Sequence, residues 1–233
     1  AKRLNKNNSK GLQLFVSSGL GGMSGAQPKA AKIAGLISVT AEINKKAILK
    51  INEQGWIDEV ISDIDLLVDR IKQLKKEQKI VSIGFEGNVI DIWEAFDKSN
   101  ITIDLGTDQS SLHNPFAGGY YPADLNFEEA NKILSNDPEL FKKLVQKSLR
   151  RHVKSINNHV KKGTYFFDYG NAFLLEAGRA NADVFNDDKS FKYPSYVQDI
   201  MGPLCCDYGF GPFRWVCLSN NAKELELTAS RAT

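Results

Sequence analysis

Four closely spaced glycines follow an apolar run near the amino end of the chain and precede an alanine-rich segment. The stretch reads FVSSGLGGMSGAQPKAAKIAG, from Phe15 to Gly35, with glycine at positions 19, 21, 22 and 25. Glycine is unfavourable in strands and in helices, so such a cluster indicates a backbone conformation or a close approach of the main chain that other residues do not permit. Its usual role is to let the main chain approach a ligand that a Cβ atom would exclude. The feature predicts a strand, a tight turn and a helix in succession.

Strand-like and helix-like segments alternate along the first half of the chain. Segments 12–18, 37–43, 79–88 and 101–109 are apolar and β-branched and are predicted to be strands. Segments 25–36, 58–78 and 89–99 have apolar residues at helical spacing, and Pro28 is tolerated in a first helical turn. This alternation predicts an α/β fold of the Rossmann-like, doubly wound type, with a mostly parallel sheet and helices on both faces.

The second half of the chain has a different composition and a different pattern of predicted elements. A long loop rich in turn-forming residues covers 110–125, and two helical patterns follow it, which we interpret as a helical insertion at 126–162. Segment 164–171, TYFFDYGN, is predicted to be a further strand that ends in Gly-Asn. We expect one nucleotide-binding domain over 1–233, with residues 1–10 disordered.

Composition limits the class of protein. The chain has 233 residues, of which 42% are hydrophobic, and a formal net charge of +2, so the core is ample and the charge favours no partner. It has no apolar run of about 18 residues, so we expect no membrane span and no signal peptide. The three cysteines, Cys205, Cys206 and Cys217, suit a reducing cytoplasm better than a disulfide framework. Because the sequence opens without methionine, we expect a domain of a longer chain.

The glycine cluster has the context of a dinucleotide-binding turn. Gly19 and Gly21 match the first two positions of G-x-G-x-x-G, while the third falls on Ser24, with Gly25 next. The loop amides would approach a pyrophosphate at the helix N-terminus. Glu42 ends the next strand, where a carboxylate would accept the ribose hydroxyls of NAD and repel the 2′-phosphate of NADP. The alternative is a glycine-rich turn that only permits close helix–strand packing.

Four longer motifs resemble those of the urocanate hydratase (urocanase) family. They are GLGGMSGAQPKAAKIAG, TDQSSLHNPFAGGYYP, FFDYGN and MGPLCCDYGFGPFRWVCLS, in the family's order and within Gly11 to about Ser219. The resemblance implies a hydro-lyase of histidine degradation that adds water to urocanate to give imidazolonepropionate. It implies tightly bound NAD⁺ that acts as an electrophile and not as a hydride carrier. It also implies a homodimer.

The resemblance further implies cofactor contacts at matched positions. The diphosphate would lie on Gly22, Met23 and Ser24, and Glu42 would hold the adenosine ribose. The remaining matched positions are Asn88, Val89, Gln109, Ser110, Ser111, Leu112, His113, Tyr120, Tyr121 and Tyr169. On chemical grounds, Arg214 is a candidate bidentate partner for the propenoate carboxylate of urocanate.

The chain also departs from the family pattern. Ala47 stands where many members carry an arginine, and GGYYP is one residue longer than the commoner form. The segment that holds the family's active-site cysteine has no match here, so we assign no catalytic residue and do not give that role to Cys205, Cys206 or Cys217. We therefore expect this chain alone not to turn over urocanate.

Two other functions stay open at this point. A conventional NAD-dependent dehydrogenase would need a substrate domain with a histidine or lysine as acid–base partner and would reduce NAD⁺ on turnover. A non-catalytic NAD-binding module would bind the cofactor without chemistry. We expect no nucleic-acid partner, because the basic run Lys142–Lys162 lacks interleaved aromatic residues.

Several other polar residues can be interpreted either as functional or as purely structural. His152 and His159 stand seven residues apart on a predicted helix, where a solvated face is favoured over a metal site, so we expect no metal. His113 is expected to have a polar role. Four carboxylates at strand ends or in glycine loops are candidates either for proton transfer or for capping their own loops: Asp104, Asp108, Asp168 and Asp207.

Overall fold

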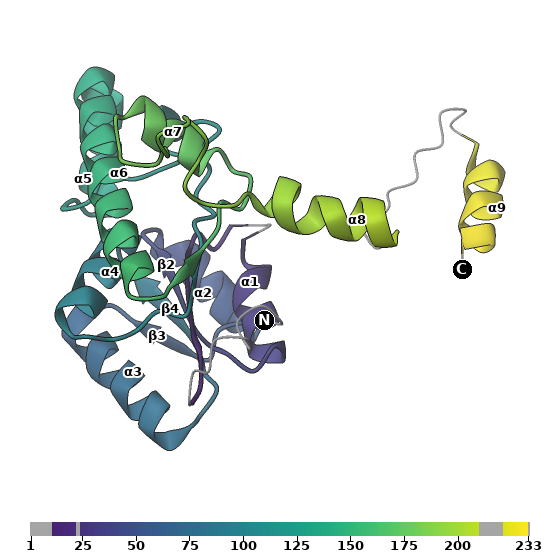
Figure 1. Cartoon of the computed structure of the whole chain (residues 1–233), viewed down its shortest axis with the longest axis horizontal. Coiled ribbons are helices and arrows are strands. Elements are labelled where there is room, and N and C mark those ends of the chain that lie inside the picture. Colours follow the sequence, from purple (N-terminus) through teal and green to yellow (C-terminus); the bar gives the residue numbers. More distant parts are fainter. Residues whose placement is uncertain (1–10, 22–23, 210–220, 233) are drawn as a thin grey trace. The chain divides into compact units, whose positions relative to one another are not determined.

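The computed structural model describes residues 11–21, 24–209 and 221–232 (Figure 1). The chain divides into two compact units, Ala1–Tyr196 and Val197–Thr233. The second unit contains helices α8 (Gly202–Tyr208) and α9 (Ala222–Ala232), and the π-helical turn η3 (Tyr196–Met201) spans the boundary. The first ten residues, for which we predicted disorder, lie outside the described residues.

A parallel sheet forms the centre of the first unit. Within the described residues its strands are β1 (Leu14–Ser18), β2 (Ile37–Glu42), β3 (Glu59–Ile61), β4 (Ser82–Glu86), β5 (Leu105–Gly106) and β6 (Tyr165–Phe166). They lie in the order β3-β4-β2-β1-β5-β6, and every neighbouring pair is parallel. The predicted doubly wound, Rossmann-like α/β fold is confirmed.

Helices cover both faces of this sheet (Figure 1). Their bounds are α1 (Ala26–Ile33), α2 (Lys45–Glu53), α3 (Ile64–Glu77), α4 (Val89–Lys98), α5 (Phe127–Asn136), α6 (Pro138–Lys161) and α7 (Phe173–Arg179), with a 3₁₀ turn η2 (Pro115–Ala117). Connections from β1 to β2 and from β2 to β3 run toward one edge, and the later ones run back toward the other. Because parallel crossovers are right-handed, α1 and α2 lie on one face and α3, α4 and α6 on the other.

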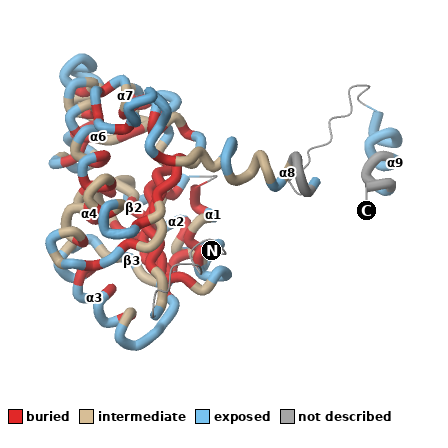
Figure 2. Tube along the Cα trace, in the orientation of Figure 1, coloured by how far each residue is buried: buried red, intermediate tan, exposed pale blue. Residues whose placement is uncertain are grey.

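The alternation of side chains along β1 distributes them between two core clusters. Leu14 and Val16 pack with residues of α3, α4 and α6, whereas Phe15 packs with Ala31 of α1. All three strand residues are buried, as Figure 2 shows for the central strands in red. Burial on both faces explains why the strand is an uninterrupted apolar run and not an alternating one.

The helix predicted over 58–78 is wrong at its beginning. Glu59–Ile61 form strand β3 on the edge of the sheet, and α3 begins only at Ile64. Asp63 caps this helix, since its carboxylate accepts the backbone N–H groups of Asp65 and Leu66, both at 2.9 Å. Val60 and Ile61 fit a helical spacing by coincidence. Helix α2, which follows β2 directly, was not predicted.

The prediction that His152 and His159 lie on a solvated helix face is also wrong. His152 and His159 are both buried, because they lie on the stripe of α6 that packs against α4 and β6. Their rings contact Trp93 of α4, with ring-centroid separations of 6.1 and 5.2 Å. Burial lowers the pKa of His152 to about 3, so this side chain is neutral in the fold.

Candidate nucleotide-binding site

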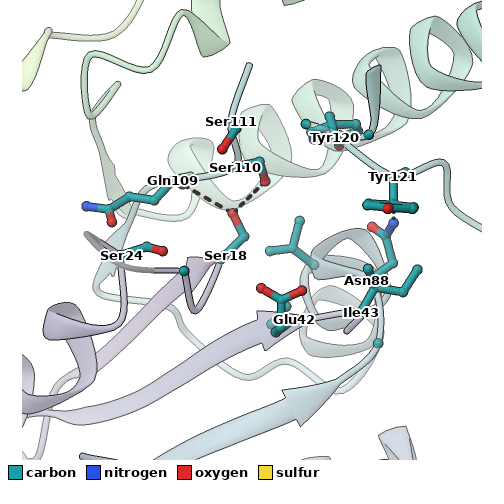
Figure 3. A pocket seen from close by; sticks show the side chains of 17 residues that line it. Ser18, Ser24, Glu42, Ile43, Asn88, Gln109, Ser110, Ser111, Tyr120 and Tyr121 are labelled. Carbon is teal, nitrogen blue, oxygen red and sulfur yellow. Dashed lines mark hydrogen bonds between the residues drawn. The ribbon is translucent and has the colours of Figure 1, made fainter. Parts of the chain in front are cut away.

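The order in which the chain adds strands to the sheet reverses at β1, which has β2 on one side and β5 on the other. In doubly wound folds the crevice at such a switch point, outside the carboxyl ends of the strands, is where ligands bind. A cavity of about 190 Å³ lies there (Figure 3). Its lining includes Ser18, Gly19, Gly21, Ser24, Glu42, Asn88, Val89, Gln109, Ser110, Ser111, Tyr120 and Tyr121.

The first part of the glycine loop closes tightly on its neighbours. Gly19 has a φ of +83°, and its N–H donates to the carbonyl of Ala41 at 2.8 Å. A Cβ atom on Gly19 would lie 3.1 Å from the carbonyl oxygen of Gln109, and one on Gly25 would lie 2.7 Å from Cδ1 of Ile51. Close packing therefore accounts for Gly25, whereas Gly19 also borders the cavity.

Helix α1 begins beside this cavity. Ser24, which is buried, lines the cavity directly before the N-cap residue Gly25. The first turn of α1 contains no acidic residue, so its N-terminal partial positive charge is not neutralised from within the turn. The predicted diphosphate contacts Gly22 and Met23 lie outside the described residues.

Glu42, at the end of β2, braces the glycine loop. One carboxylate oxygen accepts the backbone N–H of Leu20 and the other accepts that of Asn44, both at 2.9 Å. Figure 3 shows this carboxylate at the tip of β2, facing the cavity. Each carboxylate oxygen has a second lone pair, so a ribose diol can still bind here.

The loop after β5 is tied to the end of β1 by a hydroxyl. Ser18 Oγ accepts the backbone N–H of Gln109 at 3.2 Å and lies 3.2 Å from Ser110 Oγ (Figure 3). Behind these groups, the fully buried carboxylate of Asp108 accepts hydrogen bonds from the Ser18 hydroxyl, from the backbone N–H of Ser110 and from the side-chain amide of Asn171. Burial raises the pKa of Asp108 to about 6, against the lowering effect of these hydrogen bonds.

The opposite wall comes from the loop that precedes α5 and from the beginning of α4. Asn88 caps α4 through the N–H of Ile90 at 3.0 Å and donates its side-chain amide to the carbonyl of Tyr121 at 3.0 Å. The Tyr120 hydroxyl lies 3.2 Å from Nδ1 of His152 in the core. These bonds fix both tyrosines against the helical layer.

The structure thus brings most of the matched positions to one cavity, but not all. Leu112 is buried in the core cluster, and His113 is exposed beside a separate cavity bordered by Lys142 and Arg179. Tyr169 stacks on Tyr196 with ring centroids 5.0 Å apart and lines an apolar groove next to α1. Arg214 lies outside the described residues.

Two neighbours of the site were missed by sequence reasoning. Ser18 and Asn171 act through Asp108, and the only sequence signal for them is their position at strand ends. Asp168, a proton-transfer candidate, instead accepts the N–H groups of Gly170 and Leu174, which is a loop-capping role. Among the described residues, no group of three or more histidine, cysteine or acidic side chains is placed to hold a metal.

Comparison with known proteins agrees with the fold. A family model described as the urocanase Rossmann-like domain matches residues 1–200. The chain belongs to the urocanase family. It is 53% identical over 225 residues to a probable urocanate hydratase of Caenorhabditis elegans, covering 94% of this chain and 33% of that protein. It is 50% identical over 229 residues to the urocanate hydratase of Mus musculus and 48% identical over 229 residues to that of Homo sapiens, covering 95% of this chain and 34% of each relative.

The chain therefore spans about a third of the length of these curated urocanase relatives. The family model of the urocanase Rossmann-like domain covers the part of this chain up to residue 200. None of the helices in the described residues is long and apolar enough to cross a membrane.

Proposed function

We propose that this chain is the NAD⁺-binding domain of a urocanate hydratase, and that it acts in urocanate hydration together with the parts of the enzyme that its relatives carry beyond this region. The observation that carries the proposal is the cavity at the switch point, where a glycine loop, a helix N-terminus and Glu42 converge. The names of the relatives supply the reaction.

The donor set fits a dinucleotide. The first turn of α1 has no acidic residue to neutralise its partial positive charge, which favours a diphosphate there, and each Glu42 oxygen has a second lone pair for the ribose hydroxyls. The described residues that line the cavity include no lysine or arginine that would favour the 2′-phosphate of NADP. A neighbouring cavity of about 760 Å³ shares Ile43, Gly87 and Asn88 with the first, which leaves room for the adenine on the β2 side. Lys45 and Lys46 line this second cavity, so discrimination against the 2′-phosphate rests on Glu42.

The lining of the first cavity contains neither histidine nor lysine among the described residues, so the acid–base partner of a dehydrogenase would have to come from a separate substrate domain. Bound NAD⁺ would supply an electron-poor pyridinium ring that withdraws electron density from the conjugated substrate so that water can add. The residues of this chain would bind and orient the cofactor. We place the full-length enzyme in the cytoplasm, as the three cysteines suggest, and as a homodimer, as the family resemblance implies.

Calorimetry of NAD⁺ binding to the purified chain tests this proposal, with NADP⁺ as the matched ligand. We expect NAD⁺ to bind and NADP⁺ to bind at least about tenfold more weakly, because Glu42 repels the added phosphate. Equal binding, or no binding by a folded sample, would contradict the assignment of the site. Urocanate absorbance measured with the same sample should stay constant, since we expect no turnover by this chain alone.

A further inference from the structure

A buried carboxylate lies directly behind the wall of the candidate site. Asp108 has no exposed surface and accepts hydrogen bonds from the Ser18 hydroxyl, from the Ser110 N–H at 3.0 Å and from the Asn171 amide at 3.2 Å. Ser18 and Ser110 both line the cavity. A ligand that touches either hydroxyl would therefore lie roughly 5–7 Å from the carboxylate, the length of two hydrogen bonds.

No cation balances this charge within the described part of the chain. Asp108 takes part in none of the ion pairs formed by the described lysines and arginines. The ionisable group that faces it from the neighbouring loop is the buried phenol of Tyr120, whose pKa is raised well above its usual value. An unpaired buried carboxylate lowers the stability of the fold, and its charge imposes a negative potential on the adjacent cavity.

The second half of the ligand must lie near this carboxylate. If Glu42 at the end of β2 holds the adenosine ribose and the glycine loop after β1 holds the diphosphate, the nicotinamide half continues past β1. It then reaches the end of β5, and Asp108 stands two residues after that strand. The nicotinamide ring carries a positive charge in NAD⁺ and none in NADH.

We propose that Asp108 makes this site selective for the oxidised, cationic dinucleotide over the reduced, neutral one. This inference rests on the proposed NAD⁺ site and adds a specificity-determining residue to it. The diphosphate is common to both forms, so its repulsion by Asp108 cancels in the ratio of their affinities. Selectivity for the cationic ring suits a site whose cofactor acts as an electrophile.

The substitution Asp108→Asn removes the charge and keeps the hydrogen-bond network. The asparagine oxygen can accept from the Ser110 N–H and the Asn171 amide, as Oδ1 does now, while its NH₂ group faces the Ser18 and Ser110 hydroxyls, which can turn to accept. The matched control is Asp104→Asn, the same change directly before β5 at its opposite end, where the carboxylate accepts the N–H of Leu14 at 2.8 Å.

The experiment measures Kd for NAD⁺ and for NADH by calorimetry on wild type and both variants. We expect the preference for NAD⁺ to fall about 100-fold in Asp108→Asn, as for unit charges roughly 6 Å apart in an effective dielectric of about 20. The preference should be unchanged in Asp104→Asn. An unchanged preference in a folded Asp108→Asn variant overturns the inference and leaves the NAD⁺ site intact, whereas failure of both forms to bind overturns the site itself.

A second measurement needs no variant. As the pH falls through about 6, Asp108 becomes protonated, and the preference of the wild type for NAD⁺ should decline. The other groups around it are the Ser18 and Ser110 hydroxyls, the Asn171 amide and the neutral Tyr120, while Glu42 lines the same cavity on the β2 side. Because Glu42 contacts the adenosine half, which is identical in both forms, its titration cancels in the ratio. A preference that stays constant across this pH range overturns the inference.

Discussion

The substitution Glu42→Ala removes a carboxylate that we expect to serve both the protein and the ligand. Its oxygens hold the N–H groups of Leu20 and Asn44, so the variant leaves two partly buried donors without their acceptor. Because Glu42 is only half-buried, water replaces part of these bonds, and we expect the free energy of unfolding to fall by about 1–3 kcal/mol. Loss of the ribose contact should weaken NAD⁺ binding by a further 1–3 kcal/mol, or roughly 5- to 150-fold in Kd.

The two effects can be measured separately. Urea denaturation reports the loss of the loop contacts. Calorimetry with NAD⁺ and with its 2′-deoxyadenosine analogue reports the ribose contact, because loosening of the loop weakens both ligands by the same factor. The wild type should prefer NAD⁺, and Glu42→Ala should show no preference. The control variant Glu42→Gln keeps the size of the side chain but turns an NH₂ group toward one of the two N–H donors, so it should also lose stability.

Two results would refute this reasoning. If Glu42→Ala binds both ligands more weakly but keeps the wild-type preference, Glu42 acts only by holding the loop and does not touch the ribose. If Glu42→Gln is as stable as the wild type, the carboxylate does not need to accept both backbone N–H groups.

Further substitutions probe the fold, at Gly19, Gly106 and His152, with Gly55 as a control. Gly19→Ala and Gly55→Ala both place a Cβ on a residue with positive φ, at a cost of about 1–2 kcal/mol, but only Gly19→Ala crowds the loop after β5, so only it should also lose NAD⁺ binding in calorimetry. Gly106→Ala puts a Cβ 2.4 Å from the Trp93 indole and should lower the free energy of unfolding by about 1–3 kcal/mol, in part recovered by adding Trp93→Phe. His152→Phe should remove the loss of stability that His152 contributes as the pH falls below 6.5.

The sign of that pH effect follows from burial. The pKa of His152 is about 3 in the fold and 6.5 in the unfolded chain, so acid protonates the unfolded state first, and stability falls by as much as about 5 kcal/mol between these values. Asp108 acts in the opposite sense. Its raised pKa lets the folded state bind the proton first, so its contribution increases as the pH falls from about 6 to 3.8. Because the two slopes cancel in the wild type between about pH 6 and 3.8, urea midpoints over this range should fall as the pH falls in Asp108→Asn and rise in His152→Phe. Variant profiles that match the wild type would contradict both assignments.

Local patterns were enough for most of the sheet and for part of the site. The apolar run that ends at Ser18, the glycines after it and the alanine-rich helix are neighbours in sequence, so their preferences specify β1, the turn and α1 without reference to the rest of the chain. Glu42 followed in the same way from the end of the next strand. The same logic failed for Glu59–Ile61, because three residues carry too little pattern to distinguish an edge strand from the start of a helix.

The sequence by itself therefore determined the alternation of strands and helices, the position of the glycine turn and, through the family motifs, the class of protein. Only the tertiary structure decided which side chains are buried and which distant groups meet. His152 is neutral because α6 packs its stripe on α4, and Asp108 meets Ser18, 90 residues away, because β5 pairs with β1. The physical reason is that backbone preference depends on adjacent residues, whereas desolvation and hydrogen bonding in a core depend on the order of the strands, which no local pattern contains.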